Sequence, residues 1–243
     1  MNPAELKSLI ERYPFQIIPS EPGKNFFQIV TGPVRCAYLQ VDKLYANKKY
    51  PAKAPEASAT LIIPPAVSIV PLQDLAKQVA KAQFGDKLSM TFRVRNPVDG
   101  SEVETTLAKS LQWPWLPQTK NKGKPGFTAD GSGYFLRASS KFAPVRVLDK
   151  HKNQIPADDP GLYSGMWCRA LLNVYAYPKE VALGQKVHGV GVGLLQLQKI
   201  ADDERFTAGS NGDNAFDIVE AGSAVNSGST GGASIGGAPD FGL

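Results

Sequence analysis

The sequence predicts a mainly β protein, folded as a small β-barrel or sandwich with one central helix. Many short segments rich in β-branched and aromatic residues are bounded by Pro and Gly, as strands are. One longer segment repeats its apolar residues at helical spacing. The 243 residues, 42% of them apolar and 20% charged, are enough to bury the core of one large domain, alone or with a tail.

A short amphipathic helix is expected first, with Asn2 as its N-cap and Pro3 at its first helical position. Its apolar face would carry Leu6, Leu9, Ile10 and Tyr13. The remaining surface mixes charges of both signs, so we expect the helix to pack on the body rather than to bind a membrane or a partner.

Two strands and the central helix follow. Residues 26–39 and 57–63 have the composition of strands, and the Lys-rich stretch 42–55 is expected to be a loop between them. Pro71 opens the helix and Gly85 closes it. The apolar residues at helical spacing, which we expect to be buried, are Leu72, Leu75, Ala76, Val79 and Ala80.

A long loop and four more strands complete the predicted body. Residues 113–133 are rich in Pro, Gly and Lys, which is typical of a loop. The strand candidates are 134–139, 144–148, 163–177 and 187–200. Several short strands around a single helix are typical of small barrels and sandwiches.

The charge is divided unevenly along the chain. Residues 1–206 hold all 27 Lys and Arg and 18 of the 22 acidic residues, a net charge of +9, whereas 207–243 hold four acids and no cation. A basic body is expected of a polyanion binder, although many basic proteins bind no polyanion. The Gly- and Ser-rich tail is predicted to be disordered, and residues 239–243 could form a docking peptide or an inert end.

Nothing in the sequence indicates a membrane protein or a secreted one. No run of about 18 apolar residues occurs, and the N-terminus lacks the hydrophobic stretch of a signal peptide, so a soluble, cytoplasmic protein is expected. The two cysteines, Cys36 and Cys168, are too few for a disulfide scaffold or a zinc knuckle. We expect both to be buried thiols.

Catalytic motifs are absent from the sequence. His151 and His188 are the only histidines, and no spacing typical of a hydrolase, a nucleotide-binding loop or a zinc site occurs. Gly189, Gly191 and Gly193 alternate within a strand pattern instead of opening a helix, so they do not predict a dinucleotide site. We expect them to flatten one face of the strand so that backbone or a ligand can approach.

The predicted strand 163–177 separates its side chains with a period of two. Its even positions form an apolar face: Met166, Cys168, Ala170, Leu172, Val174 and Ala176. Its odd positions include rings, a guanidinium and an amide: Tyr163, Trp167, Arg169, Asn173, Tyr175 and Tyr177. Aromatic residues also stabilise sheets by pairing across strands, but rings and a cation on one face favour a ligand platform.

The segment 134–141 repeats this arrangement. One face would carry Phe135, Arg137, Ser139 and Lys141, and the other would bury Tyr134, Leu136 and Ala138. The preceding loop could close over an extended strand with Trp113, Trp115, Lys120, Lys122, Lys124 and Phe127. A cationic groove with stacking rings is typical of proteins that bind single-stranded nucleic acid, whereas duplex readers present a recognition helix.

The order of these segments resembles the bacteriophage single-stranded DNA-binding proteins that are built on an OB fold. The likeness extends over about residues 25–205, with matching stretches at 33–45, 58–64, 134–149, 163–177 and 190–200. Its most specific parts are the ASSK segment with the turn at 149–155 and the YSG-x-x-x-R-A strand opening. The resemblance implies sequence-tolerant coating of single-stranded DNA during phage replication and recombination in the host cytoplasm, without catalysis or a cofactor.

The resemblance also implies a set of DNA-binding residues. By position they are Arg35, Tyr38, Phe135, Arg137, Trp167, Arg169 and Tyr175. The loop and the end of the 134–141 segment add Trp115, Lys120, Lys122, Lys124 and Lys141. The expected domains are an N-terminal helical extension over 1–24, an OB-like domain over 25–205 and a disordered tail over 206–243.

Many proteins of that family use an acidic tail with a terminal aromatic or apolar group to contact replication partners and to compete with DNA. The tail of this chain departs from the pattern, because it is Gly-rich, weakly acidic and ends in Gly242 and Leu243 after Phe241. Contact with replication or recombination proteins through the tail is therefore expected by analogy alone.

Two alternatives of other classes stay open at this point. A virion or scaffold component would use the basic body to meet a partner protein and the tail as a tether. A metal-dependent nuclease would use Asp202, Asp203 and Glu204, but acidic groups at strand boundaries, such as these and Asp158 with Asp159, are more often solvated carboxylates.

Overall fold

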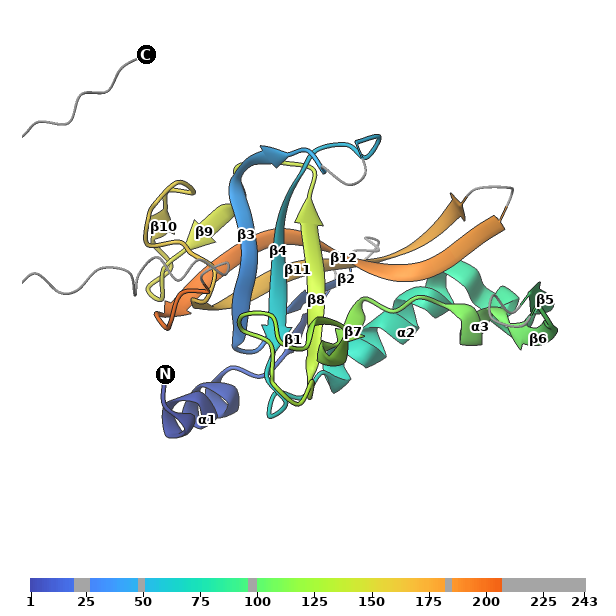
Figure 1. Ribbon diagram of the computed structural model, residues 1–243, viewed down its shortest axis with the longest axis horizontal. Coiled ribbons are helices and arrows are strands. Elements are labelled where there is room, and N and C mark those ends of the chain that lie inside the picture. Colours follow the sequence, from blue (N-terminus) through green and yellow to red (C-terminus); the bar gives the residue numbers. More distant parts are fainter. Residues whose placement is uncertain (20–26, 48–50, 96–99, 182–184, 207–243) are drawn as a thin grey trace, which may run out of the picture. The chain divides into compact units, whose positions relative to one another are not determined.

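Strands dominate the structure, which a computed structural model describes for residues 1–19, 27–47, 51–95, 100–181 and 185–206 (Figure 1). The strands are β1 (Gln16–Ile18), β2 (Phe27–Val30), β3 (Val34–Tyr45), β4 (Glu56–Ile63), β5 (Thr91–Arg95), β6 (Glu102–Thr106), β7 (Trp115–Pro117), β8 (Tyr134–Ser140), β9 (Arg146–Leu148), β10 (Gln154–Ile155), β11 (Trp167–Val181) and β12 (Gln185–Ala201). The α-helices are α1 (Pro3–Arg12), α2 (Val70–Phe84) and α3 (Leu107–Ser110), and the 3-10 helices are η1 (Gly85–Ser89) and η2 (Gln118–Asn121). The predicted mainly β class is confirmed.

Five strands close on themselves in the order β11, β3, β4, β8, β12 and back to β11. Neighbours are antiparallel except β8 and β12, which meet in parallel at Ser139 and Gly193. A small five-stranded ring of this kind is OB-like, as expected. On either side, β1 and β2 extend the sheet beside β11, and β9 and β10 extend it beside β12 (Figure 1).

The core is built from the inner faces of the ring and from α2, which packs mainly against β11. All five predicted apolar residues of α2 are buried, together with Phe84. Five of the six residues on the predicted apolar face of β11 and the turn before it are buried as well: Met166, Cys168, Ala170, Leu172 and Val174. The sixth, Ala176, is partly buried. Cys36 and Cys168 are the buried thiols that the sequence predicts.

The strand predicted at 26–39 is in fact two strands, because Gly32 and Pro33 interrupt the ladder between β2 and β3. Pro33 has no N–H to donate. At Gly32 the end of α1 comes close, since a Cβ atom there would lie 3.1 Å from the carbonyl oxygen of Tyr13. β3 then continues to Tyr45, into the stretch predicted as a loop.

The hairpin of β5 and β6 is absent from the sequence-based prediction. It forms a separate two-stranded sheet, in which Arg93 pairs with Glu102 at 3.4 Å. Its apolar residues are few, and Phe92 and Val103 are exposed. A strand that alternates charged with exposed apolar residues gives a weak signal, because little of it packs against a core.

No helix in the described part of the chain is long and apolar enough to cross a membrane. Contacts divide the chain into the units Met1–Ala208 and Gly209–Leu243, and the described residues all belong to the first. The tail predicted over 206–243 lies outside the described residues except for Phe206. Its expected disorder and the predicted domain boundaries therefore stay predictions.

Candidate nucleic-acid interface

The segment from Gln112 to Pro117 fills the gap between β8 and β12 beyond the point where these two strands meet. Gln112 forms a bridge to Gly189 of β12, and its carbonyl accepts a hydrogen bond from the N–H of Val190 at 2.8 Å. β7, three residues further on, pairs with β8. The segment that the sequence predicts to be an open loop is thus part of the wall of the ring.

Gln118 fastens the rest of this loop to the ring. Its buried side-chain amide donates to the carbonyl of Ile63 at 2.9 Å and accepts from the N–H of Thr128 at 2.9 Å. Both ends of the amide are therefore satisfied, as buried polar groups require. The prediction of a loop over 113–133 is correct for most of its length, but β7 and η2 give it a fixed course that places Lys120 beside β8.

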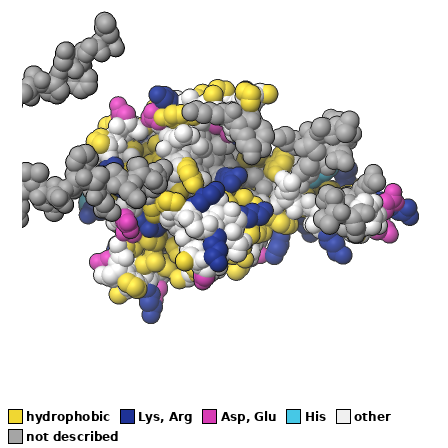
Figure 2. Space-filling model, in the orientation of Figure 1, with side chains coloured by type: hydrophobic (Ala, Val, Ile, Leu, Met, Phe, Trp, Pro, Cys, Tyr) yellow, Lys and Arg dark blue, Asp and Glu magenta, His cyan; other side chains and the backbone are white. Residues whose placement is uncertain are grey.

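Two adjoining cavities of about 840 and 1100 Å³ form one groove, and their linings share Lys53, Glu56, Arg137 and Ser139. The groove crosses β4 and β8, which are the second and third of the five ring strands in chain order, and continues to β11 and β12. The corresponding face of OB folds binds oligonucleotides. Figure 2 shows Lys and Arg side chains over the middle of the face on which β4 and β8 lie in Figure 1.

Aromatic rings line the larger cavity. Trp113 and Trp115 stack with their centroids 5.2 Å apart and their planes 13° apart. The ring centroids of Tyr175 and Tyr177 on β11 lie 6.3 Å apart. Tyr134 of β8 was predicted to be buried, but it is exposed. All five rings belong to the lining of this cavity. Because every base has a π-face, such rings stack on bases of any sequence.

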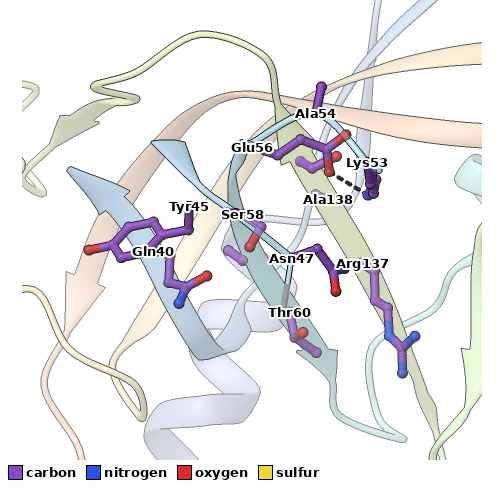
Figure 3. A pocket seen from close by; sticks show the side chains of 13 residues that line it. Gln40, Tyr45, Asn47, Lys53, Ala54, Glu56, Ser58, Thr60, Arg137 and Ala138 are labelled. Carbon is purple, nitrogen blue, oxygen red and sulfur yellow. Dashed lines mark hydrogen bonds and ion pairs between the residues drawn. The ribbon is translucent and has the colours of Figure 1, made fainter. Parts of the chain in front are cut away.

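Three cations accompany these rings. Arg137 on β8 and Lys120 in η2 are exposed within the groove. Lys53, in the loop before β4, forms an ion pair with Glu56 at 2.6 Å (Figure 3). Glu56 is the one acidic side chain among the described residues that line the two cavities. The groove therefore carries net positive charge where a phosphate chain would lie.

The glycines of β12 leave room for the two tyrosine rings against this strand. Gly191 pairs with Tyr175 and Gly189 with Tyr177 across the β11–β12 ladder. A Cβ atom would lie 3.0 Å from the Tyr175 ring at Gly191 and 2.7 Å from the Tyr177 hydroxyl at Gly189. Burial raises the pKa of Tyr175, and the charge of Glu56 adds to the effect. The alternating glycines thus flatten one strand face, as expected, and the rings occupy the space.

Phe135 lies on the predicted outer face of β8, but its expected exposure is wrong. The side chain is 0% exposed, because a second, small apolar cluster covers this part of the sheet with Phe127 and Phe206. The rings of Phe127 and Phe135 meet edge to face, with centroids 5.4 Å apart. A ring without exposed surface cannot stack on a base. Periodicity indicated the correct face of the strand, but not the loop that covers it.

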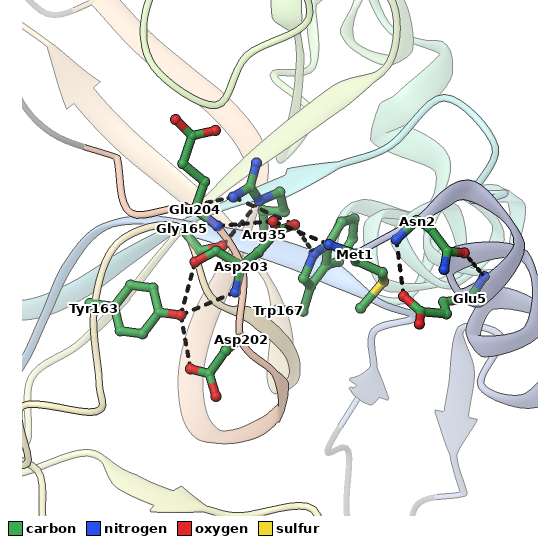
Figure 4. Close-up of polar contacts among 10 residues, drawn as sticks. All are labelled: Met1, Asn2, Glu5, Arg35, Tyr163, Gly165, Trp167, Asp202, Asp203 and Glu204. Carbon is green, nitrogen blue, oxygen red and sulfur yellow. Dashed lines mark hydrogen bonds and ion pairs between the residues drawn. The ribbon is translucent and has the colours of Figure 1, made fainter.

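Trp167 is likewise buried, so its predicted place on an open platform is wrong. It is 5% exposed, and its indole N–H donates to the carboxylate of Asp203 at 2.6 Å (Figure 4). Arg35 is the neighbour of Trp167 across the β11–β3 ladder. Its guanidinium donates a hydrogen bond to the carbonyl of Glu204 at 2.8 Å, and its Nη2 lies 3.7 Å from Oδ2 of Asp203. The segment 202–206 therefore covers this end of the sheet.

Neighbouring groups shift the pKa values of the charged residues in this covered region. Burial lowers the pKa of Arg35, while the charge of Asp203 opposes that change. For Asp203, burial resists ionisation, but the hydrogen bond from Trp167 and the charge of Arg35 hold its pKa below the ordinary value of 3.8. Asp202 pairs with Lys199 at 2.6 Å. Two of the acids of the nuclease alternative are thus engaged, and no three metal-ligating side chains gather among the described residues.

Arg169 is held by the N-terminal region and lies outside the lining of the groove. It donates to the carbonyl of Thr31 at 3.1 Å, and its guanidinium lies 4.8 Å from the centroid of the Tyr13 ring. Four further predicted residues are exposed but also lie outside the lining, and their DNA contacts stay predictions: Tyr38, Lys122, Lys124 and Lys141.

The groove brings together four of the twelve predicted DNA-binding residues, Trp115, Lys120, Arg137 and Tyr175. It adds residues that the predicted set omits: Lys53, Trp113, Tyr134 and Tyr177. The sequence held a signal for three of them, since Trp113 belongs to the aromatic loop, Tyr177 to the polar face of β11 and Lys53 to a Lys-rich loop.

In this OB-like fold, β4 and β8 carry a groove of cations and stacking aromatic rings. This combination is typical of one class, the proteins that bind single-stranded nucleic acid. Residues 27–226 match the family model described as the single-stranded DNA-binding protein of Enterobacter phage Enc34. The match spans most of the chain, and the chain belongs to this family. No curated protein matches this chain.

Solved structures of phage proteins are also similar to this chain. The single-stranded DNA-binding protein of bacteriophage Enc34 is 19% identical, with a TM-score of 0.48 over 83% of this chain and 99% of that one. Its complex with single-stranded DNA is 18% identical, with a TM-score of 0.47 over 79% and 99%. The gp2.5 single-stranded DNA-binding protein of bacteriophage T7 is 13% identical, with a TM-score of 0.45 over 83% and 100%.

Proposed function

We propose that this protein binds single-stranded DNA along the groove by two kinds of contact. Lys120 and Arg137 neutralise phosphates, and bases stack on the rings beside them. The observation that carries the proposal is the single groove in which the stacked pair Trp113 and Trp115 lies with exposed cations. Membership of a family named for single-stranded DNA binding supports the same function.

A titration of labelled oligothymidine at several salt concentrations tests the proposal. Because neutralised phosphates release counterions, the logarithm of the binding constant should fall linearly with the logarithm of the salt concentration, by about 0.7 for each phosphate contact on a single strand. Duplex DNA of the same length should bind more weakly, since its bases cannot reach the rings. An affinity that does not change with salt, or that is equal for the duplex, would contradict the proposal.

The wider role that we propose is to coat and protect single strands during phage replication and recombination in the host cytoplasm, without catalysis. The family match supports binding and does not favour the alternative of a virion or scaffold component. Recruitment of replication or recombination proteins by the tail belongs to the same proposal. Labelled single strands incubated with the protein and magnesium should stay intact, whereas cleavage products would overturn the non-enzymatic role.

A further inference from the structure

Glu56 occupies an unusual place for a carboxylate. It begins β4, lines both cavities of the groove, and its side chain is 19% exposed. A negative charge at this place repels phosphates, so it weakens the binding of any polyanion that passes with its backbone toward it. The backbone of a bound strand should therefore follow Lys120 and Arg137, with its bases turned toward Glu56.

The surroundings of Glu56 differ from the aromatic part of the groove. Gln40, Ser58 and Ser139 stand side by side on β3, β4 and β8 and line the smaller cavity. Figure 3 shows Gln40 and Ser58 on neighbouring strands of the same cavity as Glu56. Amides and hydroxyls both donate and accept hydrogen bonds. The ring of Tyr45, which pairs with Glu56 across the β3–β4 ladder, lines this cavity too, so this end of the groove offers polar partners for base edges beside one ring.

Glu56 lines the same cavity as a stacking ring, that of Tyr175. Its charge acts on the hydroxyl of Tyr175, which lines the cavity that the two residues share. A base stacked on Tyr175 would direct one of its edges toward the carboxylate. Lys53, whose Nζ lies 2.6 Å from a carboxylate oxygen of Glu56, fixes the orientation of that carboxylate. An ionised carboxylate only accepts hydrogen bonds, so it attracts an amino group and repels a carbonyl oxygen.

We propose that Glu56 accepts a hydrogen bond from the exocyclic amino group of the base beside Tyr175, so that this position prefers cytosine to thymine or uracil. Cytosine carries an amino donor at the position where thymine and uracil carry a carbonyl acceptor. The inference rests on the proposed function and concerns one position in a groove that otherwise tolerates any sequence.

Competition between oligodeoxycytidine and oligodeoxyuridine of equal length, at one salt concentration, tests the inference. These bases differ mainly in the group that would face Glu56. The protein should prefer oligodeoxycytidine by about tenfold, as expected for one specific base contact. In Glu56→Gln the ratio of the two affinities should fall close to one, because the amide both accepts and donates hydrogen bonds. Glu102→Gln in the β5–β6 hairpin, outside the groove lining, is the matched control and should keep the preference.

A second variant separates the base contact from general electrostatics. Lys120→Gln removes a cation of the groove but leaves Glu56 and its partner Lys53 in place, so it should lower the salt slope by about 0.7 and keep the preference for cytosine. Equal affinity of the unaltered protein for the two oligomers would overturn the inference. So would a Glu56→Gln variant that binds both oligomers more tightly with an unchanged ratio, because Glu56 would then only repel phosphates. Binding of neither oligomer would instead overturn the proposed function.

Discussion

Tyr175 and Trp167 project from the same face of β11, yet only Tyr175 reaches the groove: it is 43% exposed, and Trp167 is 5% exposed. The difference arises from what covers the strand. The segment 202–206 returns across the start of β11 and bonds to Trp167 through Asp203, while the Tyr175 end pairs with glycines of β12. Two aromatic residues of one strand therefore have different roles.

Tyr175→Ala should weaken binding to oligothymidine by about 1–3 kcal/mol, the value of one stacked base, and leave the thermal transition in place. Trp167→Ala should instead cost about 3–5 kcal/mol of folding stability, because it empties a buried site. Fluorescence titration and urea unfolding of both variants measure the two effects. The assignment is wrong if Trp167→Ala keeps its stability and loses affinity.

Gly191→Ala should displace the Tyr175 ring and weaken binding by about 1 kcal/mol, the lower end of the stacking range. The added methyl group would meet the ring at 3.0 Å, and the ring can move. Gly193→Ala is the matched control on the same strand, since its nearest neighbours lie at 3.8 Å, an ordinary contact distance. Equal affinities of the two variants for oligothymidine would show that the ring position does not matter for binding.

Arg137→Gln and Lys120→Gln should each reduce the salt slope of binding by about 0.7, because each removes one phosphate contact. The slope from titrations at several salt concentrations measures this directly. Lys77→Gln, on an exposed turn of α2 outside the groove lining, should leave the slope unchanged. A slope that falls equally in all three variants would mean that net charge, rather than the groove, determines binding.

The fold was predictable where a local pattern decides it. The even positions of β11 from Cys168 to Val174 and the apolar stripe of α2 are buried as their periods predict, because a period fixes which side chains share a face. The break at Gly32 was missed, although Gly and Pro at that point carry the signal. The hairpin of β5 and β6 was missed because its charged strands bury little.

The site was less predictable, because exposure depends on segments distant in sequence. Trp167, Arg35 and Phe135 lie in one row across β11, β3 and β8, with Ile62 of β4 between Arg35 and Phe135. This row carries the rings and cations of a binding platform, but Phe127 and the segment 202–206 cover it. No pattern within a strand reveals such a cover. The open groove lies further along the same strands.

Asp203→Asn should make the folded domain less stable at neutral pH by about 1–3 kcal/mol, because the bonds to Trp167 and Arg35 lose their charge. The folded-state pKa of Asp203 is lowered, so its contribution is present above the ordinary value of 3.8 and is lost as the pH falls through the lowered value. Urea unfolding from neutral to acidic pH should therefore show a difference between protein and variant that shrinks in acid. Asp74→Asn, on the surface of α2, should produce no such difference. If the difference in unfolding free energy between the protein and Asp203→Asn stayed constant with pH, the carboxylate would contribute through its shape rather than its charge.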